Sequence, residues 1–188
     1  MAQTPSTLLS LDAFLQRPET KPASEFIQGK VVQKPMPQGK HSRTQQKLTA
    51  KIDIVLEDPQ IALAFPELRC TFGGRSLVPD IAVFTRDRIP TQSDGNIANQ
   101  FDVTPDWAIE ILSPNQSSTR VISNILHCLS HGTQLGWLID PETEMVLIYF
   151  PNQQTISLYS MDDRLPVPSF AAEIHLTLGQ VFDWLKLR

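Results

Sequence analysis

The run from Asp106 to Leu112, with the sequence DWAIEIL, constrains the fold more than any other segment of this chain. Its continuous apolar character indicates a strand that is buried on both faces. A helix is predicted from about Ser117 to His131, with Gly132 as its C-cap, and the following run QLGWLID is again typical of a strand. The residues of this helix expected to face inward are Val121, Ile122, Ile125, Leu126 and Leu129. A strand, a helix and a strand in this order predict a right-handed crossover within one sheet.

The rest of the pattern adds helices and strands on both sides of this unit. Ser10 caps a short helix in LSLDAFLQR, and EFIQGKVVQKPMPQG contains two extended pieces that turn at Gln28-Gly29. A helical period follows from His41 to Glu57. Further strands are expected in IALAFPELRCTF, LVPDIAVF, EMVLIYF and TISLYS, before a final helix capped by Thr177. This order predicts an α/β or α+β fold in which helices flank a mixed sheet.

Composition narrows the class of protein. The 188 residues suit one domain, with an N-terminal helix and linker in 1–24 and a C-terminal helical extension in 161–188. No apolar run approaches the roughly 20 residues of a membrane helix, and the N-terminus lacks the pattern of an export signal. Cys70 and Cys128 form no CxxC pair, so we expect buried free thiols in a cytoplasmic protein. The net charge of −4 argues against stable DNA binding, but it allows an enzyme that grips nucleic acid through a local basic patch and a metal ion.

Two of the apolar runs each carry one acidic residue, Asp80 in VPDIAVF and Glu110 in DWAIEIL. A buried carboxylate costs several kcal/mol unless it is neutralised, hydrogen-bonded or bound to a metal. Two of them in neighbouring strands would raise a pKa or recruit a cation, and oxygen ligands with several waters suit Mg²⁺. The residues alone leave another interpretation open, in which Asp80 caps a turn after Pro79 and Glu110 pairs with a lysine at a sheet edge.

The stretch from Val78 to Asp140 resembles the Uma-type restriction-endonuclease family. The matching pieces are VPDIAVF, PDWAIEILSP and HGTQLGWLIDPE with the following VLIYF, and FIQGKVVQKPMPQGKHS is similar to the start of that family. The resemblance covers roughly residues 8–160 and implies a PD-(D/E)xK nuclease-like, restriction-endonuclease-like fold with a mixed central sheet between helices. It further implies that Asp80 and Glu110 bind Mg²⁺ or Mn²⁺, with the main-chain carbonyl of Ile111 as a further ligand.

The lysine that the family's fold normally uses is absent from two expected places. The position two residues after the second acid is Leu112, and the family's alternative position on the following helix, eleven residues beyond Ser113, is Asn124. Such a lysine orients the attacking water and offsets charge on the phosphate. Asn124 can donate a hydrogen bond but brings no charge. Arg120, one turn earlier on the same face, could supply charge but cannot act as a base, and an exposed surface arginine is the alternative.

Other polar residues are weaker candidates for the site. His41 and Gln45 fall on the core-facing stripe at the start of their helix, although His41 could instead bond a loop carbonyl. His127 and His131 have the i, i+4 spacing of zinc-binding helices, but the sequence offers neither an evident third ligand nor the HExxH glutamate. Three lysines of the N-terminal hairpin and loop could also supply positive charge, and the sequence favours none of them over the others: Lys30, Lys34 and Lys40.

These observations leave three hypotheses for function. The first is metal-dependent hydrolysis of DNA phosphodiester bonds by Asp80 and Glu110, impaired to the extent that the lysine is missing. The second is a catalytically inactive relative that binds nucleic acid or protein. The third is a homo-oligomeric structural protein whose apolar edge strand, Val146 to Phe150, pairs across a twofold axis. We expect a homodimer, which is compatible with all three.

Overall fold

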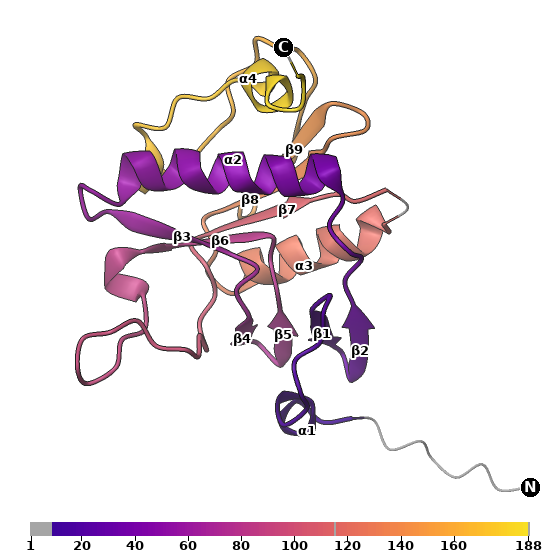
Figure 1. The fold of residues 1–188 in the computed structure, drawn as a ribbon, viewed down its shortest axis with the longest axis vertical. Coiled ribbons are helices and arrows are strands. Elements are labelled where there is room, and N and C mark those ends of the chain that lie inside the picture. The colour runs from indigo at the N-terminus through magenta and orange to yellow at the C-terminus, as the bar shows by residue number, and fades with distance from the viewer. Residues whose placement is uncertain (1–8, 115, 188) are drawn as a thin grey trace, which may run out of the picture.

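The computed structural model describes residues 9–114 and 116–187. The predicted single domain over residues 1–188 stays a prediction, and its residues 1–8, 115 and 188 lie outside the described part. Figure 1 shows a central sheet crossed by one long helix, with a smaller group of strands below it. A short helix, α1 (Leu11–Leu15), begins after Ser10, whose side chain accepts a hydrogen bond from Ala13 N as a helix N-cap does.

The central sheet has six strands in the spatial order β10-β9-β8-β7-β6-β3. In chain order they are β3 (Ala62–Pro66), β6 (Ile81–Thr85), β7 (Trp107–Ile111), β8 (Leu135–Asp140), β9 (Met145–Tyr149) and β10 (Ile156–Leu158). The strands β7 and β8 are parallel, and the remaining neighbours are antiparallel. The sheet is therefore mixed, and the parallel pair is the one that the strand–helix–strand pattern predicted.

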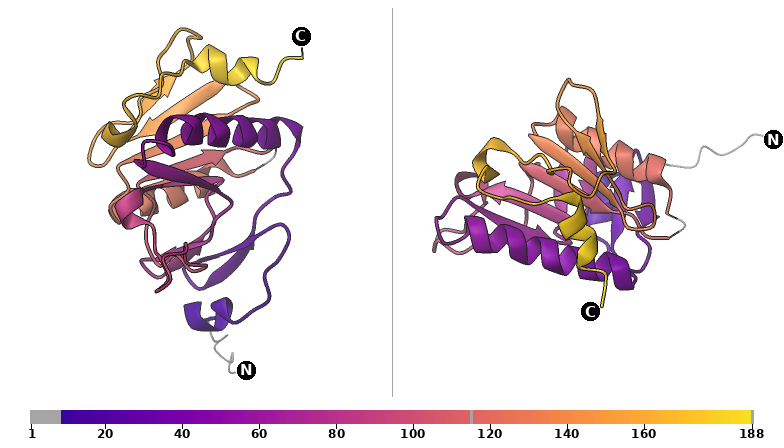
Figure 2. Two further views of the ribbon diagram at one scale, coloured as in Figure 1. Left: turned by 60° about the vertical axis from the view of Figure 1, so that its left-hand side comes forward. Right: turned by 90° about the horizontal axis from the view of Figure 1, so that it is seen from above.

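Helices cover both faces of this sheet (Figures 1 and 2). On one face lie α2 (Gly39–Leu56) and α4 (Leu178–Asp183), whose apolar side chains share a core with the sheet. On the other face lies α3 (Ser118–Ser130). Side chains alternate along β7, so Ile109 and Ile111 join the α2 core while Ala108 contacts the α3 side, and Glu110 shares the face of Ala108. This layering confirms the predicted α+β class.

A second, four-stranded sheet has the order β2-β1-β5-β4. Its strands are β1 (Ser24–Ile27), β2 (Lys30–Gln33), β4 (Cys70–Phe72) and β5 (Arg75–Leu77). The turn between β1 and β2 has positive φ angles of 50° at Gln28 and 79° at Gly29. Two successive left-handed residues form the type I′ turn that suits the twist of a two-residue hairpin. The predicted turn at Gln28-Gly29 is thereby confirmed.

Two predicted strands, IALAFPELRCTF and LVPDIAVF, are each divided between the two sheets, so their prediction as single strands was wrong. The first becomes β3 and β4, and in the second Leu77 ends β5 while residues 81–84 belong to β6. Proline explains both divisions, because Pro66 ends β3 and Pro79, between β5 and β6, has no N–H to donate to a ladder. Asp80 therefore lies where the chain passes from one sheet to the other, and not inside a strand.

The proposed edge strand from Val146 to Phe150 was also wrong. Most of it forms β9, which lies between β8 and β10 because the chain turns after Phe150 and pairs TISLYS back onto it. The outer strands of the described sheet are β10 and β3. The homodimer itself stays a prediction.

The buried face of α3 differs from the predicted one. Val121 and Ile125 are buried as expected, but Leu126 is 51% exposed, whereas Asn124 and Cys128 are buried. A polar side chain can be buried here because Asn124 has a hydrogen-bond partner in the small sheet. Cys70 and Cys128 are buried free thiols, as predicted. Across the described residues, every helix is too short or too polar to span a membrane.

Candidate active site

Asp80 lies at the junction of the two sheets, and both of its carboxylate oxygens have partners. Its Oδ1 lies 2.6 Å from Lys34 Nζ. Its Oδ2 accepts a 2.7 Å hydrogen bond from the main-chain N–H of Ile111 and lies 3.1 Å from His41 Nε2. The Gln45 amide donates a 2.7 Å hydrogen bond to the main-chain carbonyl of Asp80. The first turns of α2 thus hold both the side chain and the backbone of this residue.

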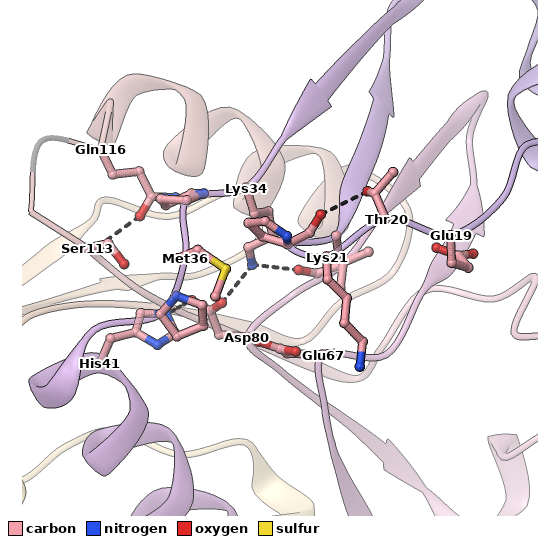
Figure 3. Close-up of a pocket in the computed structure, with 15 residues that line it drawn as sticks. Glu19, Thr20, Lys21, Lys34, Met36, His41, Glu67, Asp80, Ser113 and Gln116 are labelled. Carbon is pink, nitrogen blue, oxygen red and sulfur yellow. Dashed lines mark hydrogen bonds and ion pairs between the residues drawn. The ribbon is translucent and has the colours of Figure 1, made fainter.

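Lys34 follows β2 and joins the two acids that the sequence singled out. Its Nζ is 2.6 Å from Asp80 Oδ1 and 3.4 Å from Glu110 Oε2, and it donates a 2.7 Å hydrogen bond to the carbonyl of Val78. Figure 3 shows the ammonium group directed toward Asp80, with His41 on the opposite side of that carboxylate. Because Asp80 and Glu110 contact the same nitrogen, their carboxylates belong to one site.

A third buried acid, Glu25 of β1, adjoins this pair and was missed by the sequence analysis. Its Oε1 accepts a 2.9 Å hydrogen bond from Val78 N, and its Oε2 accepts a 3.0 Å hydrogen bond from Asn124 Nδ2. Among the described residues, Asn124 Oδ1 has no hydrogen-bond partner. The only signal in the sequence was an acid directly before Phe26 and Ile27, and such a residue is more often exposed on the polar face of a hairpin.

Burial and mutual repulsion decide the ionisation of the acids. Burial raises the pKa of Glu25, against the attraction of the Lys34 ammonium. Burial also raises the pKa of Glu110 well above its ordinary value of 4.5, and the negative charges of Asp80 and Glu25 add to this effect. Burial alone would raise the pKa of Asp80 too, but the Lys34 charge and the His41 contact outweigh it and lower that pKa. Glu110 is therefore the acid that retains a proton most readily.

Lys34 stays charged at this site. Its burial opposes the charged form, but Asp80, Glu110 and Glu25 surround the amine and raise its pKa above the ordinary 10.5. Three buried carboxyl groups around one ammonium leave an excess of negative charge when all are ionised. A site of this kind attracts a further cation or holds a proton.

The site is open to solvent through a pocket of about 360 Å³. Lys34, His41 and Asp80 line it, together with Ser113 and Gln116 from the segment between β7 and α3. A smaller cavity of about 30 Å³ adjoins Glu25, Glu110, Asn124 and Arg120. Asp80 therefore faces the larger pocket and Glu110 the smaller one, although Asp80 itself is only 1% exposed.

The structure brings some of the predicted site residues together and separates others. Asp80, Glu110, His41 and Gln45 meet at one place, and Ile111 joins them through its amide N–H. Asn124 contacts Glu25 instead of the central pair. The remaining candidates lie at the periphery: Arg120 and Lys30 are exposed, and Lys40 pairs with Glu142 at 3.0 Å.

The donor set determines which metal would fit. Within residues 9–114 and 116–187, no group of three or more His, Cys, Asp or Glu side chains is arranged to hold an ion. Asp80 and Glu110 supply two carboxylates beside excess negative charge, and Mg²⁺ is bound in this way, by one or two carboxylates with several waters. These residues therefore fit Mg²⁺ or Mn²⁺.

The histidine pair of α3 is engaged in other contacts. His127 Nε2 lies 3.2 Å from the carbonyl of Phe72, and His131 Nδ1 lies 2.8 Å from the carbonyl of His127. The His127 ring also stacks on the Phe72 ring, with centroids 5.1 Å apart. These contacts explain the pair as packing between α3 and the small sheet.

Comparison with known proteins identifies the family to which this fold belongs. Residues 11–179 match the Uma2 family, described as "Putative restriction endonuclease". A crystal structure from Anabaena variabilis, of a "putative nuclease belonging to DUF820", is 56% identical in sequence, with a TM-score of 0.94 over 95% of this chain and 99% of that one. No curated protein matches the chain. Because the family match spans most of the sequence and the solved structure shares the fold, the chain belongs to the Uma2 family.

Proposed function

We propose that this protein hydrolyses phosphodiester bonds in DNA, with Mg²⁺ or Mn²⁺ bound by Asp80 and Glu110 and with Lys34 in the role of the family's lysine. The observation that supports this most directly is the position of Lys34 Nζ, within 2.6 Å of Asp80 and 3.4 Å of Glu110. A lysine that follows the N-terminal hairpin thus brings to the acids the positive charge that Leu112 and Asn124 cannot supply.

Each residue of the site would have a different role in this reaction. A divalent ion there would supply an activated water and offset the charge of the phosphate. Lys34 stays protonated, since its pKa is raised, and therefore contributes positive charge to the transition state and does not act as a base. His41 and Gln45 hold Asp80 in place. Glu25, fixed by Asn124 and Val78, adds a negative charge that attracts and orients Lys34.

A second candidate function has its own supporting observation. Both oxygens of Asp80 already have protein partners, so this carboxylate is satisfied without a metal. A buried ion pair of this kind can be purely structural. The protein would then be an inactive relative that binds nucleic acid or another protein, and its binding to DNA would weaken with salt.

Plasmid nicking distinguishes the two functions. Wild-type protein is expected to nick supercoiled plasmid with Mg²⁺ or Mn²⁺ and to stop when a chelator is added, and Asp80→Asn and Glu110→Gln should abolish the activity. Lys34→Met should lower the rate by about 10²–10³, as the loss of a transition-state charge contact does. Lys30→Met is the matched control, because Lys30 is exposed on the same hairpin, and it should leave the rate unchanged.

A rescue experiment tests the role of Lys34 more sharply. Asn124→Lys places an ammonium at the helix position that the family uses, next to Glu25. In a protein that also carries Lys34→Met, it should raise the nicking rate at least about tenfold above that of Lys34→Met alone. This corresponds to an activation free energy lower by about 1.4 kcal/mol. Salt-sensitive DNA binding without metal-dependent nicking by the wild type would instead support the inactive relative.

A further inference from the structure

The pocket above Asp80 has walls of mixed character, with apolar side chains on one part of the lining and charged or polar side chains on the rest. Its volume is about 360 Å³, near the lower end of the roughly 300–1,000 Å³ typical of small-ligand sites. The loop after β2 contributes Pro35, Met36 and Pro37, and the segment before β1 contributes Pro22. Met36 lines the pocket together with Lys34, His41 and Asp80 (Figure 3). A space of this size holds roughly one nucleotide unit.

Asp80 lies at the base of this pocket and not on an open surface, whereas Glu110 lines the smaller cavity that adjoins the site. Asp80 is 1% exposed and Glu110 is 3% exposed, while the Lys34 side chain is 13% exposed. A phosphate must therefore enter the pocket to reach them. In a duplex each phosphate is held beside the paired strand, across grooves about 6 and 12 Å wide, whereas an unpaired strand can bend to place one phosphate and its base in the pocket.

The charges at the pocket also disfavour a duplex. Lys21 lies on the pocket wall, but Glu67 lines the same pocket, as does Glu19, whose carboxylate is paired with Arg69. The whole chain carries a net charge of −4. Proteins that hold duplex DNA neutralise many phosphates at once, whereas a single strand can be bound by fewer charges together with contacts to the faces of its bases.

We propose that the site acts on an unpaired DNA strand, such as a flap, a gap or a frayed end. One nucleotide enters the pocket, its base lies against Met36 and the neighbouring prolines, and its phosphate reaches Lys34 and Asp80. This inference rests on the proposed nuclease function and specifies its substrate class.

Binding and cleavage are measured separately, so that the two proposals fail independently. Binding is measured on Glu110→Gln protein by fluorescence anisotropy, with a labelled single-stranded oligonucleotide and with the same sequence paired as a duplex. The single strand should bind at least about tenfold more tightly, which corresponds to 1.4 kcal/mol. Equal or tighter binding of the duplex, or no binding of either, overturns the inference.

A matched pair of variants locates the binding in the pocket. Met36 is 63% exposed at the pocket, and Met161, which is 38% exposed, contacts Gly179 of α4 instead. In the Glu110→Gln background, Met36→Glu should weaken single-strand binding by about tenfold, because the new carboxylate repels the phosphate. Met161→Glu should leave it unchanged, and equal losses in both variants contradict the pocket assignment.

Cleavage by the wild-type protein completes the test. With Mg²⁺, the unpaired segment of a flap substrate should be cut in preference to its duplex part. Faster cleavage of intact duplex would overturn this inference while the nuclease proposal stands. If no substrate is cut, the nuclease proposal fails, and the anisotropy measurements still decide whether the pocket takes a single strand.

Discussion

Lys34 brings a positive charge to Asp80 and Glu110 from a segment far away in the sequence. The chemistry of such a site needs a cation beside two carboxylates, but it does not require that the cation come from a particular element. A long lysine side chain can reach the acids from the loop after β2 as well as from the helix after β7. This explains how Asn124 can occupy the helix position, where it donates to Glu25 and brings no charge.

Glu110 should make the stability of the protein depend on pH. Burial raises the pKa of this carboxyl well above 4.5 in the folded protein. Its contribution to stability is therefore fully present below about pH 4.5 and is lost as pH rises through the folded pKa. In the presence of a chelator, Glu110→Gln should raise the free energy of unfolding at pH 8, because the amide replaces a buried carboxyl group that ionises as pH rises. Urea denaturation across pH measures this difference.

The difference between Glu110→Gln and wild type should shrink toward pH 4.5, where the unfolded carboxyl becomes protonated as well. Glu173→Gln is the control, because Glu173 is exposed, and it should leave the free energy of unfolding within about 0.5 kcal/mol of wild type. A Glu110→Gln protein that is destabilised by the same amount at every pH would show that the carboxylate is bound in its ionised form.

Among the elements, the β1–β2 hairpin has the largest effect on the site. It carries Glu25 on β1 and leads from β2 directly into Lys34, and it joins the rest of the protein mainly through the pairing of β1 with β5. The register of a hairpin is set by its turn. The positions of Glu25 and Lys34 relative to Asp80 therefore depend on the turn at Gln28 and Gly29.

Replacing Gly29 should weaken this hairpin. Gly29 has a φ of 79°, in the left-handed region that costs other residues about 1–2 kcal/mol. Gly29→Ala should therefore lower the free energy of unfolding by about 1 kcal/mol and the Tm by about 2–4 °C, and it should also slow plasmid nicking. Differential scanning calorimetry and the nicking assay measure the two effects.

Gly39 provides the matched control for Gly29. It is the first residue of α2, and a Cβ placed on it would meet no atom within 4 Å. Gly39→Ala should be neutral or stabilising by about 0.4–1 kcal/mol, because alanine restricts the unfolded chain. If both alanine variants have the same stability, the left-handed turn does not constrain the hairpin.

For the protein as a whole, metal binding and folding should be coupled. The acids that would hold the ion are far apart in the sequence and meet only when β6 pairs with β7 in the folded sheet. A ligand that binds the folded state alone stabilises it by about 2.7 kcal/mol at a concentration of 100 times its Kd. Mg²⁺ should therefore raise the Tm of the wild type by about 5–10 °C at such a concentration.

The specificity of this shift identifies its source. Asp80→Asn with Glu110→Gln should abolish the Mg²⁺-dependent rise in Tm, and NaCl at matched ionic strength should not reproduce it in the wild type. A rise that persists in the double variant would place the ion elsewhere in the molecule. A homodimer and a cytoplasmic location remain predictions, which gel filtration with light scattering and cell fractionation would test.

Local sequence patterns predicted most of the fold. The parallel strands β7 and β8, the helix between them, the hairpin turn at Gln28-Gly29 and the cap at Thr177 depend on neighbouring residues, through periodicity, turn geometry and capping. The same patterns identified Asp80 and Glu110, because an acid within an apolar run is visible without any knowledge of distant contacts.

Contacts between distant segments decided the remainder. The assignment of the divided strands to two different sheets and the inner position of β9 depend on which strands pair in space. Glu25 and Lys34 look like ordinary residues of an exposed hairpin in the sequence. They become part of the site because the hairpin folds against Asp80 and Glu110, where burial strengthens every charge interaction. The local sequence pattern thus determines most of the secondary structure. The balance of charges in the site arises only when segments far apart in the sequence come together in an interior of low dielectric constant.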